Sequence, residues 1–370
     1  MLVLLTSLRR AGHGGRGGSF SGRAAVLDDP GLYGPRRPLP LRVRPVPGES
    51  TGSFVNRLAH ANGLRLAAFL DRVGQGQASA YPERVEKYPQ STEMYVNEAG
   101  LRYLAVLADR AAGLLQQDLP SLGAEHLLPG PEAAQWRWRW EPVAGHLVRY
   151  CPLCADALGV GEAVWLMSPD NWQVCLRHGY WSDDSRGRGP DFVQLAELPE
   201  TVTAHQVRQQ LAERWGPAGE ELFADAFQVA VYWWTRMPDT VCWVRRAWTA
   251  GLDAREMRAA PLVIYPEAAE LAGAMLDFER AGQRDTTDRS RWLAGVEQLM
   301  AGRGVDVAEG RQALLMWLGR HRRGVPAPSG PAGGNGLLLG AGHSRIASRA
   351  GPVSQRSCLN WQLGMAAADM

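Results

Sequence analysis

The sequence predicts a mainly α-helical chain with a small module of cysteine and histidine residues in its middle and disordered segments at both ends. Three observations support this fold class: two predicted helices joined by a glycine-containing turn near residue 62, a double pair of metal-ligand residues after residue 150, and apolar stripes at helical spacing after residue 204. The length of 370 residues allows two or three domains of roughly 100 to 200 residues each. We predict a disordered N-terminal extension, a helix-turn-helix domain, a zinc-finger module of the zinc-ribbon kind, a C-terminal helical domain and a flexible tail, with the bounds 1–38, 39–130, 131–200, 201–323 and 324–370.

The two ends of the chain have the composition of unfolded segments. Residues 1–38 and 324–356 are rich in glycine or proline and show no hydrophobic periodicity. Such segments cannot bury enough apolar surface to offset the entropy that ordering would cost. We therefore predict that the extension is disordered and that the tail is flexible.

The charges of the chain exclude some classes of protein and point to one region. Forty basic against 38 acidic side chains give a net charge of +2, which excludes a polybasic, histone-like chain and an acidic solvating one. Residues 39–77 hold five arginines against two acidic residues, a local net charge of +3. If the protein meets nucleic acid, we expect it to do so there.

Hydropathy and cysteine content indicate the compartment. No run of about 18 consecutive apolar residues occurs, so we expect no membrane span. Five cysteines, an odd number in a long chain, argue against a disulfide framework. We therefore expect a cytoplasmic protein.

Residues 50–70 predict the first helix pair. Ser50, Thr51 and Ser53 are candidate N-caps, and Asn62-Gly63 has the composition of a helix end or turn before a second apolar helical pattern. Two helices around a short turn form the outline of a helix-turn-helix, and two helices packed in a core without any DNA role are the equal alternative. The side chains that we predict to contact DNA lie on the first helix (Arg57), on the second helix (Arg65, Arg72) and further along the chain (Arg177).

The next segments are interpreted as structural. A second helix pair over 101–119 lies in an acidic region, residues 78–135 summing to −4, so packing in a core is the favoured interpretation. Residues 136–140, Trp-Arg-Trp-Arg-Trp, alternate with a period of two and predict a strand, which we interpret as an edge strand with its aromatic face inward rather than a phosphate-binding surface. Apolar stripes over 222–234, 292–300 and 314–318 predict core helices.

The central motif consists of Cys151 and Cys154, then twenty residues, then Cys175 and His178. Two ligand pairs, each with a gap of two residues, can converge on one ion at tetrahedral angles. Three thiolates and one imidazole suit Zn²⁺, and four protein ligands leave no open position for a catalytic water. The spacing therefore predicts one structural zinc ion.

Other interpretations of this motif are weaker. A redox Cys-x-x-Cys motif needs no second pair, and a chance match is improbable for four residues at this double spacing. A zinc-dependent nuclease or hydrolase would need an open coordination site and a carboxylate, for which Asp170, Asp183 and Asp184 are the nearby residues. The sequence contains no phosphate-binding loop, no nucleophile elbow and no His-Glu-x-x-His helix, so no assembled active site is predicted.

Two segments together resemble the TniQ family of transposon target-selection proteins, whose relatives include TnsD. Residues 44–64, with Pro47-Gly48-Glu49-Ser50, are similar to the family's opening helical unit. Residues 149–179, with Trp165 and Trp172 between the two ligand pairs, resemble the family's zinc finger. The second knuckle has leucine where the family often has proline, and no further Cys-x-x-Cys pair follows, so a second zinc site is not expected.

The resemblance implies a non-enzymatic adaptor that recognises a target and recruits an AAA+ transposition ATPase of the TnsC or TniB kind. In this family the target is a DNA site or an RNA-guided target complex. Carried over to this chain, the metal ligands are Cys151, Cys154, Cys175 and His178. The alternative function is a stand-alone zinc-containing, DNA-binding transcriptional regulator, and the sequence leaves open whether the chain forms a homodimer.

Overall fold

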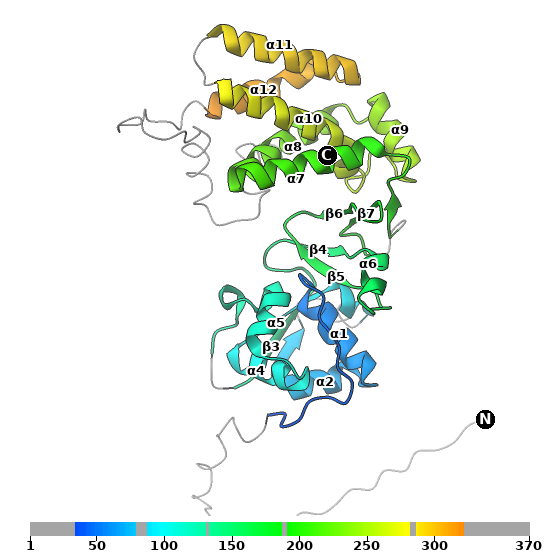
Figure 1. Ribbon diagram of the computed structural model, residues 1–370, viewed down its shortest axis with the longest axis vertical. Coiled ribbons are helices and arrows are strands. Elements are labelled where there is room, and N and C mark those ends of the chain that lie inside the picture. The colour runs from blue at the N-terminus through cyan, green and yellow to red at the C-terminus, as the bar shows by residue number, and fades with distance from the viewer. Residues whose placement is uncertain (1–33, 79–86, 131–132, 187–190, 282–285, 322–370) are drawn as a thin grey trace, which may run out of the picture.

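The computed structural model describes residues 34–78, 87–130, 133–186, 191–281 and 286–321. The residues 1–33 of the predicted extension and the whole predicted tail lie outside this range. The described chain is mostly helical and is elongated, with an N-terminal unit at one end, a strand-containing module in the middle and a bundle of helices at the other end (Figure 1). Within the described residues, no helix is both long and apolar enough to cross a membrane.

The N-terminal unit packs helices against a three-stranded sheet. Its α-helices are α1 (Thr51–Ala61), α2 (Leu66–Val73), α4 (Glu98–Leu107) and α5 (Ala112–Asp118). Its strands are β1 (Gln75–Ala78), β2 (Glu93–Val96) and β3 (Gln135–Arg139), and short 3-10 turns are η2 (Pro89–Ser91), η3 (Pro120–Leu122) and η4 (Ala124–His126). The predicted positions of both helix pairs agree with these elements, except at the start of α2.

Strand β3 corrects two predictions. It pairs in parallel with β1 and antiparallel with β2, so it is the central strand of the sheet and not an edge strand. The N-terminal unit therefore extends to residue 139, past the predicted boundary at 130. The predicted alternation is right, because Trp138 is buried in the core of this unit while Arg137 is exposed. Periodicity shows the two faces of a strand but not which distant segments pair with it.

The first helix begins and ends at predicted residues. The Ser50 hydroxyl accepts a hydrogen bond from the Ser53 backbone N–H at 3.0 Å and caps α1, and Asn62 is the C-cap, followed by Gly63 at a φ of 63°. The second helix starts later than predicted. Arg65 has an extended backbone and is the N-cap of α2, so it precedes the helix instead of lying on it.

The middle module consists of two small antiparallel sheets and one short helix. Strand β4 (His146–Arg149) pairs with β5 (Trp165–Ser168), and helix α6 (Pro152–Ala157) lies between them in the chain. The second sheet has the order β6 (Trp172–Cys175), β7 (Tyr180–Asp183) and β8 (Val193–Gln194). The rings of Trp172 and Trp181 stack with centroids 4.7 Å apart and contact Tyr265 of the helical bundle edge-on. The second sheet thus packs into the C-terminal core.

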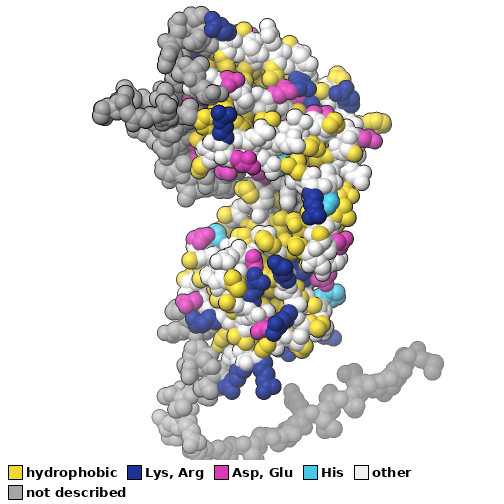
Figure 2. Space-filling view, in the orientation of Figure 1, with side chains coloured by type: hydrophobic (Ala, Val, Ile, Leu, Met, Phe, Trp, Pro, Cys, Tyr) yellow, Lys and Arg dark blue, Asp and Glu magenta, His cyan; other side chains and the backbone are white. Residues whose placement is uncertain are grey.

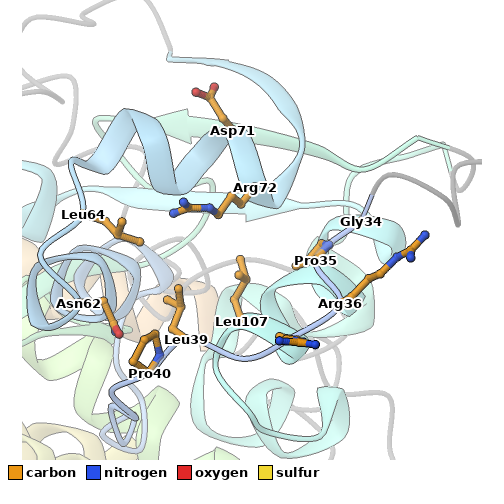
Figure 3. A pocket seen from close by; sticks show the side chains of 11 residues that line it. Gly34, Pro35, Arg36, Leu39, Pro40, Asn62, Leu64, Asp71, Arg72 and Leu107 are labelled. Carbon is orange, nitrogen blue, oxygen red and sulfur yellow. The ribbon is translucent and has the colours of Figure 1, made fainter.

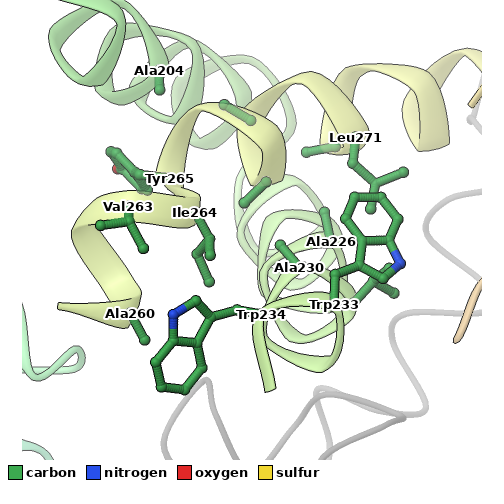
Figure 4. Close-up of a cluster of buried hydrophobic side chains, with 14 of the residues drawn as sticks. Ala204, Ala226, Ala230, Trp233, Trp234, Ala260, Val263, Ile264, Tyr265 and Leu271 are labelled. Carbon is green, nitrogen blue, oxygen red and sulfur yellow. The ribbon is translucent and has the colours of Figure 1, made fainter. Parts of the chain in front are cut away.

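The C-terminal unit is a helical bundle. Its helices are α7 (Pro199–Trp215), α8 (Pro217–Arg236), α9 (Val241–Thr249), α10 (Ala260–Ala281), α11 (Thr286–Arg303) and α12 (Val307–His321). The predicted apolar stripes lie within α8, α11 and α12. Trp233 and Trp234 of α8 lie beside Ile264 and Leu271 of α10 in the core (Figure 4).

A buried carboxyl group in the N-terminal unit predicts a pH dependence of stability. Glu93 is fully buried, and burial raises its pKa from 4.5 to about 8. One of its oxygens accepts hydrogen bonds from the backbone N–H groups of Thr51 and Met94, both at 2.9 Å. A raised pKa in the folded state means that the folded protein binds this proton more tightly than the unfolded chain does.

Stability should therefore fall as the pH rises from about 4.5 towards 8, by up to about 1.4 kcal/mol per pH unit from this group. Glu93→Gln keeps an acceptor oxygen but cannot ionise. We expect this variant to match the parent protein near pH 5 and to be the more stable of the two above pH 8, in urea unfolding followed by tryptophan fluorescence. A constant difference between the two proteins across this range would contradict the assignment.

Candidate metal centre and basic surface

Four ligand-type side chains converge in the middle module. Cys151 follows β4 and is the N-cap of α6, and Cys154 lies in the first turn of that helix. Cys175 is the last residue of β6, and His178 lies in the tight turn to β7, where Cys175 pairs with Tyr180. Gly179, at a φ of 63°, allows the turn to close through its N–H bond to the Cys175 carbonyl at 2.8 Å.

The distances between the donor atoms fit a tetrahedral site. Zinc–ligand bond lengths imply tetrahedral edges of about 3.8 Å between two sulfurs and about 3.6 Å between a sulfur and a nitrogen. The Sγ atoms of Cys154 and Cys175 are 3.7 Å apart. His178 Nδ1 lies 3.4, 3.3 and 3.6 Å from the Sγ atoms of Cys151, Cys154 and Cys175. The four residues could therefore hold a metal ion through three sulfurs and one imidazole nitrogen.

Burial and the closeness of the thiols raise the pKa of acidic groups in the cluster. Burial, together with the neighbouring thiols of Cys151 and Cys154, raises the pKa of the Cys175 thiol to about 12. Burial and the adjacent thiols likewise raise the pKa of Tyr150 to about 12. Thiolates are therefore strongly disfavoured here unless a positive charge balances them, and a bound cation supplies that charge.

The segment that precedes α1 bonds the N-terminal unit to this module. The N–H of Ser50 donates to the carbonyl of Trp165 at 2.8 Å, and the N–H of Met167 donates to the carbonyl of Gly48 at 2.9 Å. The N–H of Trp165 in turn donates to the Ser53 hydroxyl at 3.2 Å. The start of α1 is thus fixed directly to β5, and Gly48 adopts a φ of 80° in this turn.

Glu49 and Arg57 form a buried ion pair at this junction. Arg57 donates from Nε to Oε1 of Glu49 at 2.9 Å and from Nη2 to Oε2 at 2.6 Å. The Ser53 hydroxyl and the Val46 N–H also donate to the same carboxylate, at 2.8 and 3.0 Å. The side chain of Glu49 is 0% exposed and that of Arg57 is 3% exposed.

The prediction that Arg57 contacts DNA is therefore wrong. Its guanidinium donates hydrogen bonds to Glu49 and to the Arg44 carbonyl, and its side chain is too deeply buried to contact a phosphate. Sequence analysis missed the role of Glu49 and Arg57 as a structural pair. A signal was present, because Arg57 falls among Phe54, Val55 and Leu58 on the apolar face of the helix, where a charged residue needs a partner.

The other three predicted DNA contacts are exposed, but they do not form one cluster in the fold. Arg65 and Arg72 lie at the start and in the last turn of α2, and no ion pair of either is formed within the described part of the chain. Arg177 lies in the turn between β6 and β7, beside His178 in the middle module. Figure 2 shows basic side chains spread over the N-terminal unit, the lower end of the view.

The carboxylates considered for hydrolysis are engaged separately. Asp170 pairs with Arg208 at 2.5 Å, Asp183 with Arg258 at 2.6 Å, and Asp184 lies 3.6 Å from His146. Among the residues that the structure describes, they form no metal-binding group with one another or with the cysteine cluster. Their geometry therefore gives no support to the nuclease alternative.

Comparison with known proteins finds one family whose model matches part of the chain. The model of the TniQ family matches residues 40–181, a range that contains α1, α2 and the four ligand-type residues. No curated protein and no solved structure matches the chain. The match covers both the helical unit and the Cys/His cluster as one continuous region. Residues 40–181 are therefore a TniQ domain, which supports membership of the TniQ family and indicates a role related to transposition.

Proposed function

We propose that this protein is a non-enzymatic target-selection adaptor of transposition, which binds DNA and recruits an AAA+ ATPase of the TnsC or TniB kind. The observation that carries the proposal is the single family match over both the helix pair and the Cys/His cluster. The donor set of three sulfurs and one imidazole nitrogen supports Zn²⁺ as the ion. With four protein ligands, that ion has a structural role.

In this proposal α1 and α2 form the helix-turn-helix. The exposed face of α2 carries Arg72 and the small residues Ala67 and Ala68, and Arg65 stands at its N-terminus. Small exposed residues let a helix approach the edges of base pairs, and flanking arginines can bind the phosphates. The buried pair of Glu49 and Arg57 joins α1 to the segment that precedes it and so affects the position of α2 only indirectly.

Replacing Arg65 and Arg72 together by alanine tests the DNA contact. Loss of two phosphate contacts should weaken duplex binding at least about tenfold at moderate salt and lower the salt slope by about 1.8. Fluorescence anisotropy over a salt series measures both quantities. A matched control is Arg255→Ala with Arg311→Ala, which changes the net charge equally in the distant helical bundle. If the two double variants bind alike, α2 is not the DNA contact.

The recruitment step has its own test. Purified protein should retain an AAA+ ATPase of the TnsC or TniB kind in a pull-down, and the variants of α2 should retain it equally, because they alter only the DNA contact. Binding of one promoter-like site without any affinity for that ATPase would instead favour the stand-alone transcriptional regulator. Capture of an RNA-guided complex in place of free DNA would make that complex the target.

A further inference from the structure

A groove of about 600 Å³ lies between the segment 34–41 and the helices of the N-terminal unit (Figure 3). We call this segment the strap. It runs past the C-terminal ends of α1 and α4, and α2 forms the opposite wall. Strap residues that line the groove include Arg36, Arg37 and Leu39, and Arg72 lines it from α2. The predicted disordered extension reached residue 38, so its last residues, 34–38, are part of this ordered wall.

Hydrogen bonds to the main chain of the strap fix it to the helices. The N–H of Leu39 donates to the Leu107 carbonyl at 3.0 Å. The side-chain amide of Asn62 bonds Leu41 twice, accepting from its N–H at 2.8 Å and donating to its carbonyl at 2.9 Å. Gly34 passes so closely over the ring of Tyr103 that a Cβ atom there would lie 2.5 Å from ring carbons. The backbone that carries the arginines of the strap is therefore held in place.

The walls of the groove are basic. Arg36, Arg37 and Arg72 are exposed, and no salt bridge of Arg37 or Arg72 is formed within the described residues. The acidic residue of the lining, Asp71, projects from α2 away from Leu39 and Leu107 in Figure 3. The guanidinium groups of Arg37 and Arg72, with Arg36 beside them, thus border a concave surface, and the carboxylate in its lining, Asp71, projects away from Leu39 and Leu107. This arrangement favours an anionic ligand.

We propose that this groove binds the sugar–phosphate backbone of duplex DNA, with the strap acting as an arm beside α2. The proposal rests on the proposed function and adds Arg36 and Arg37 to the contact. The charges continue along α2 to Arg65, as an extended polyanion requires. An acidic peptide with an apolar anchor fits less well, because Leu107 is 3% exposed and Leu39 and Leu64 are half-buried in packing the strap.

The test is the double variant Arg36→Ala with Arg37→Ala in the full chain. Its binding to a fluorescein-labelled random-sequence duplex is measured by anisotropy over a salt series. We expect about a five- to tenfold loss of affinity and a salt slope lower by about 1 to 2, equally for unrelated sequences, because phosphate contacts carry no sequence information. Metal content and melting temperature should stay as in the parent protein. Arg255→Ala with Arg311→Ala is again the charge-matched control.

The outcomes separate this proposal from the proposed function. If the strap variant binds DNA like the control while Arg65→Ala with Arg72→Ala weakens binding, the groove proposal is overturned and α2 remains the DNA contact. If the strap variant keeps its DNA affinity but loses binding to labelled poly-glutamate, the groove takes an acidic peptide, which also overturns the proposal. If the parent protein binds no duplex, both proposals fail together.

A second variant tests whether the strap must be held in place. Asn62→Ala removes both hydrogen bonds to Leu41 and leaves every arginine present. Asn62 is a positioning residue, so the variant should lose a smaller part of the affinity, about two- to threefold, with the salt slope nearly unchanged. An unchanged affinity would show that the strap need not be preorganised.

Discussion

Cys154→Ser is expected to release the metal ion and to destabilise the middle module. A serine hydroxyl is a poor ligand for a soft metal site, and the three remaining donors cannot close the tetrahedron. Loss of a second-sphere partner alone typically weakens metal binding about 10- to 100-fold, so loss of a ligand should cost more than about 100-fold in affinity. Protein purified from zinc-replete medium should contain one zinc per chain by elemental analysis, and the variant should contain far less.

The destabilisation should reach the C-terminal bundle. The strand that ends at Cys175 begins at Trp172, which packs against Tyr265. Thermal unfolding of the variant should therefore begin at a lower temperature, and chelation of the parent protein should have the same effect. The matched control is Cys242→Ser, because the thiol of Cys242 donates to the Arg303 carbonyl at 3.2 Å, far from the cluster in sequence. Absence of zinc from metal-replete parent protein, or equal metal content in both variants, would refute the site.

Arg57→Met should have the second large effect, a loss of about 3 to 5 kcal/mol of folding free energy. It removes the cation from a pair in which Glu49 is 0% exposed, so a carboxylate is left buried without its charge partner. The expected loss is larger than that of any exposed arginine, because water cannot reach the carboxylate to replace the missing hydrogen bonds. Urea unfolding at pH 7 measures it.

Two further variants test whether the unpaired buried charge of Glu49 causes the loss of stability in Arg57→Met. Arg102→Ala breaks an exposed pair with Glu98, four residues apart on α4, and should cost no more than about 0.5 kcal/mol. Glu49→Gln combined with Arg57→Met removes both charges while an acceptor oxygen remains for Ser53. This double variant should be more stable than Arg57→Met alone. If Arg57→Met costs as little as Arg102→Ala, the pair is not a major source of stability.

The Cys/His cluster was predictable because its four residues follow a short, regular spacing in the sequence. A gap of two residues within each pair limits where the side chains can point, so four positions in the sequence were enough to name the donors. The buried contact of Arg57 and the position of Arg65 before α2 were not predictable in this way. Whether an arginine on an amphipathic helix faces solvent or a buried carboxylate depends on Glu49, which lies outside that helix.

Local sequence patterns also failed to predict parts of the fold. Helix α10 gave no apolar stripe, because consecutive residues from Leu262 to Tyr265 are all buried and the first half of the helix is covered on every side. Pro266 lies inside this helix, where a proline would ordinarily predict an end. The pairing of β3 with β1 joins segments about 60 residues apart, which no local pattern records.

The bonds between the start of α1 and β5 also constrain how the chain folds during synthesis. Ser53 and Trp165 are 112 residues apart in sequence. At translation rates of roughly 5 to 20 residues per second, the N-terminus of α1 waits about 6 to 22 s before its partner strand is made. A nascent chain can form its first helices in that interval, yet the turn before α1 gains its last hydrogen bonds only when β5 emerges from the ribosome. Completion of the N-terminal unit is therefore tied to synthesis of the middle module.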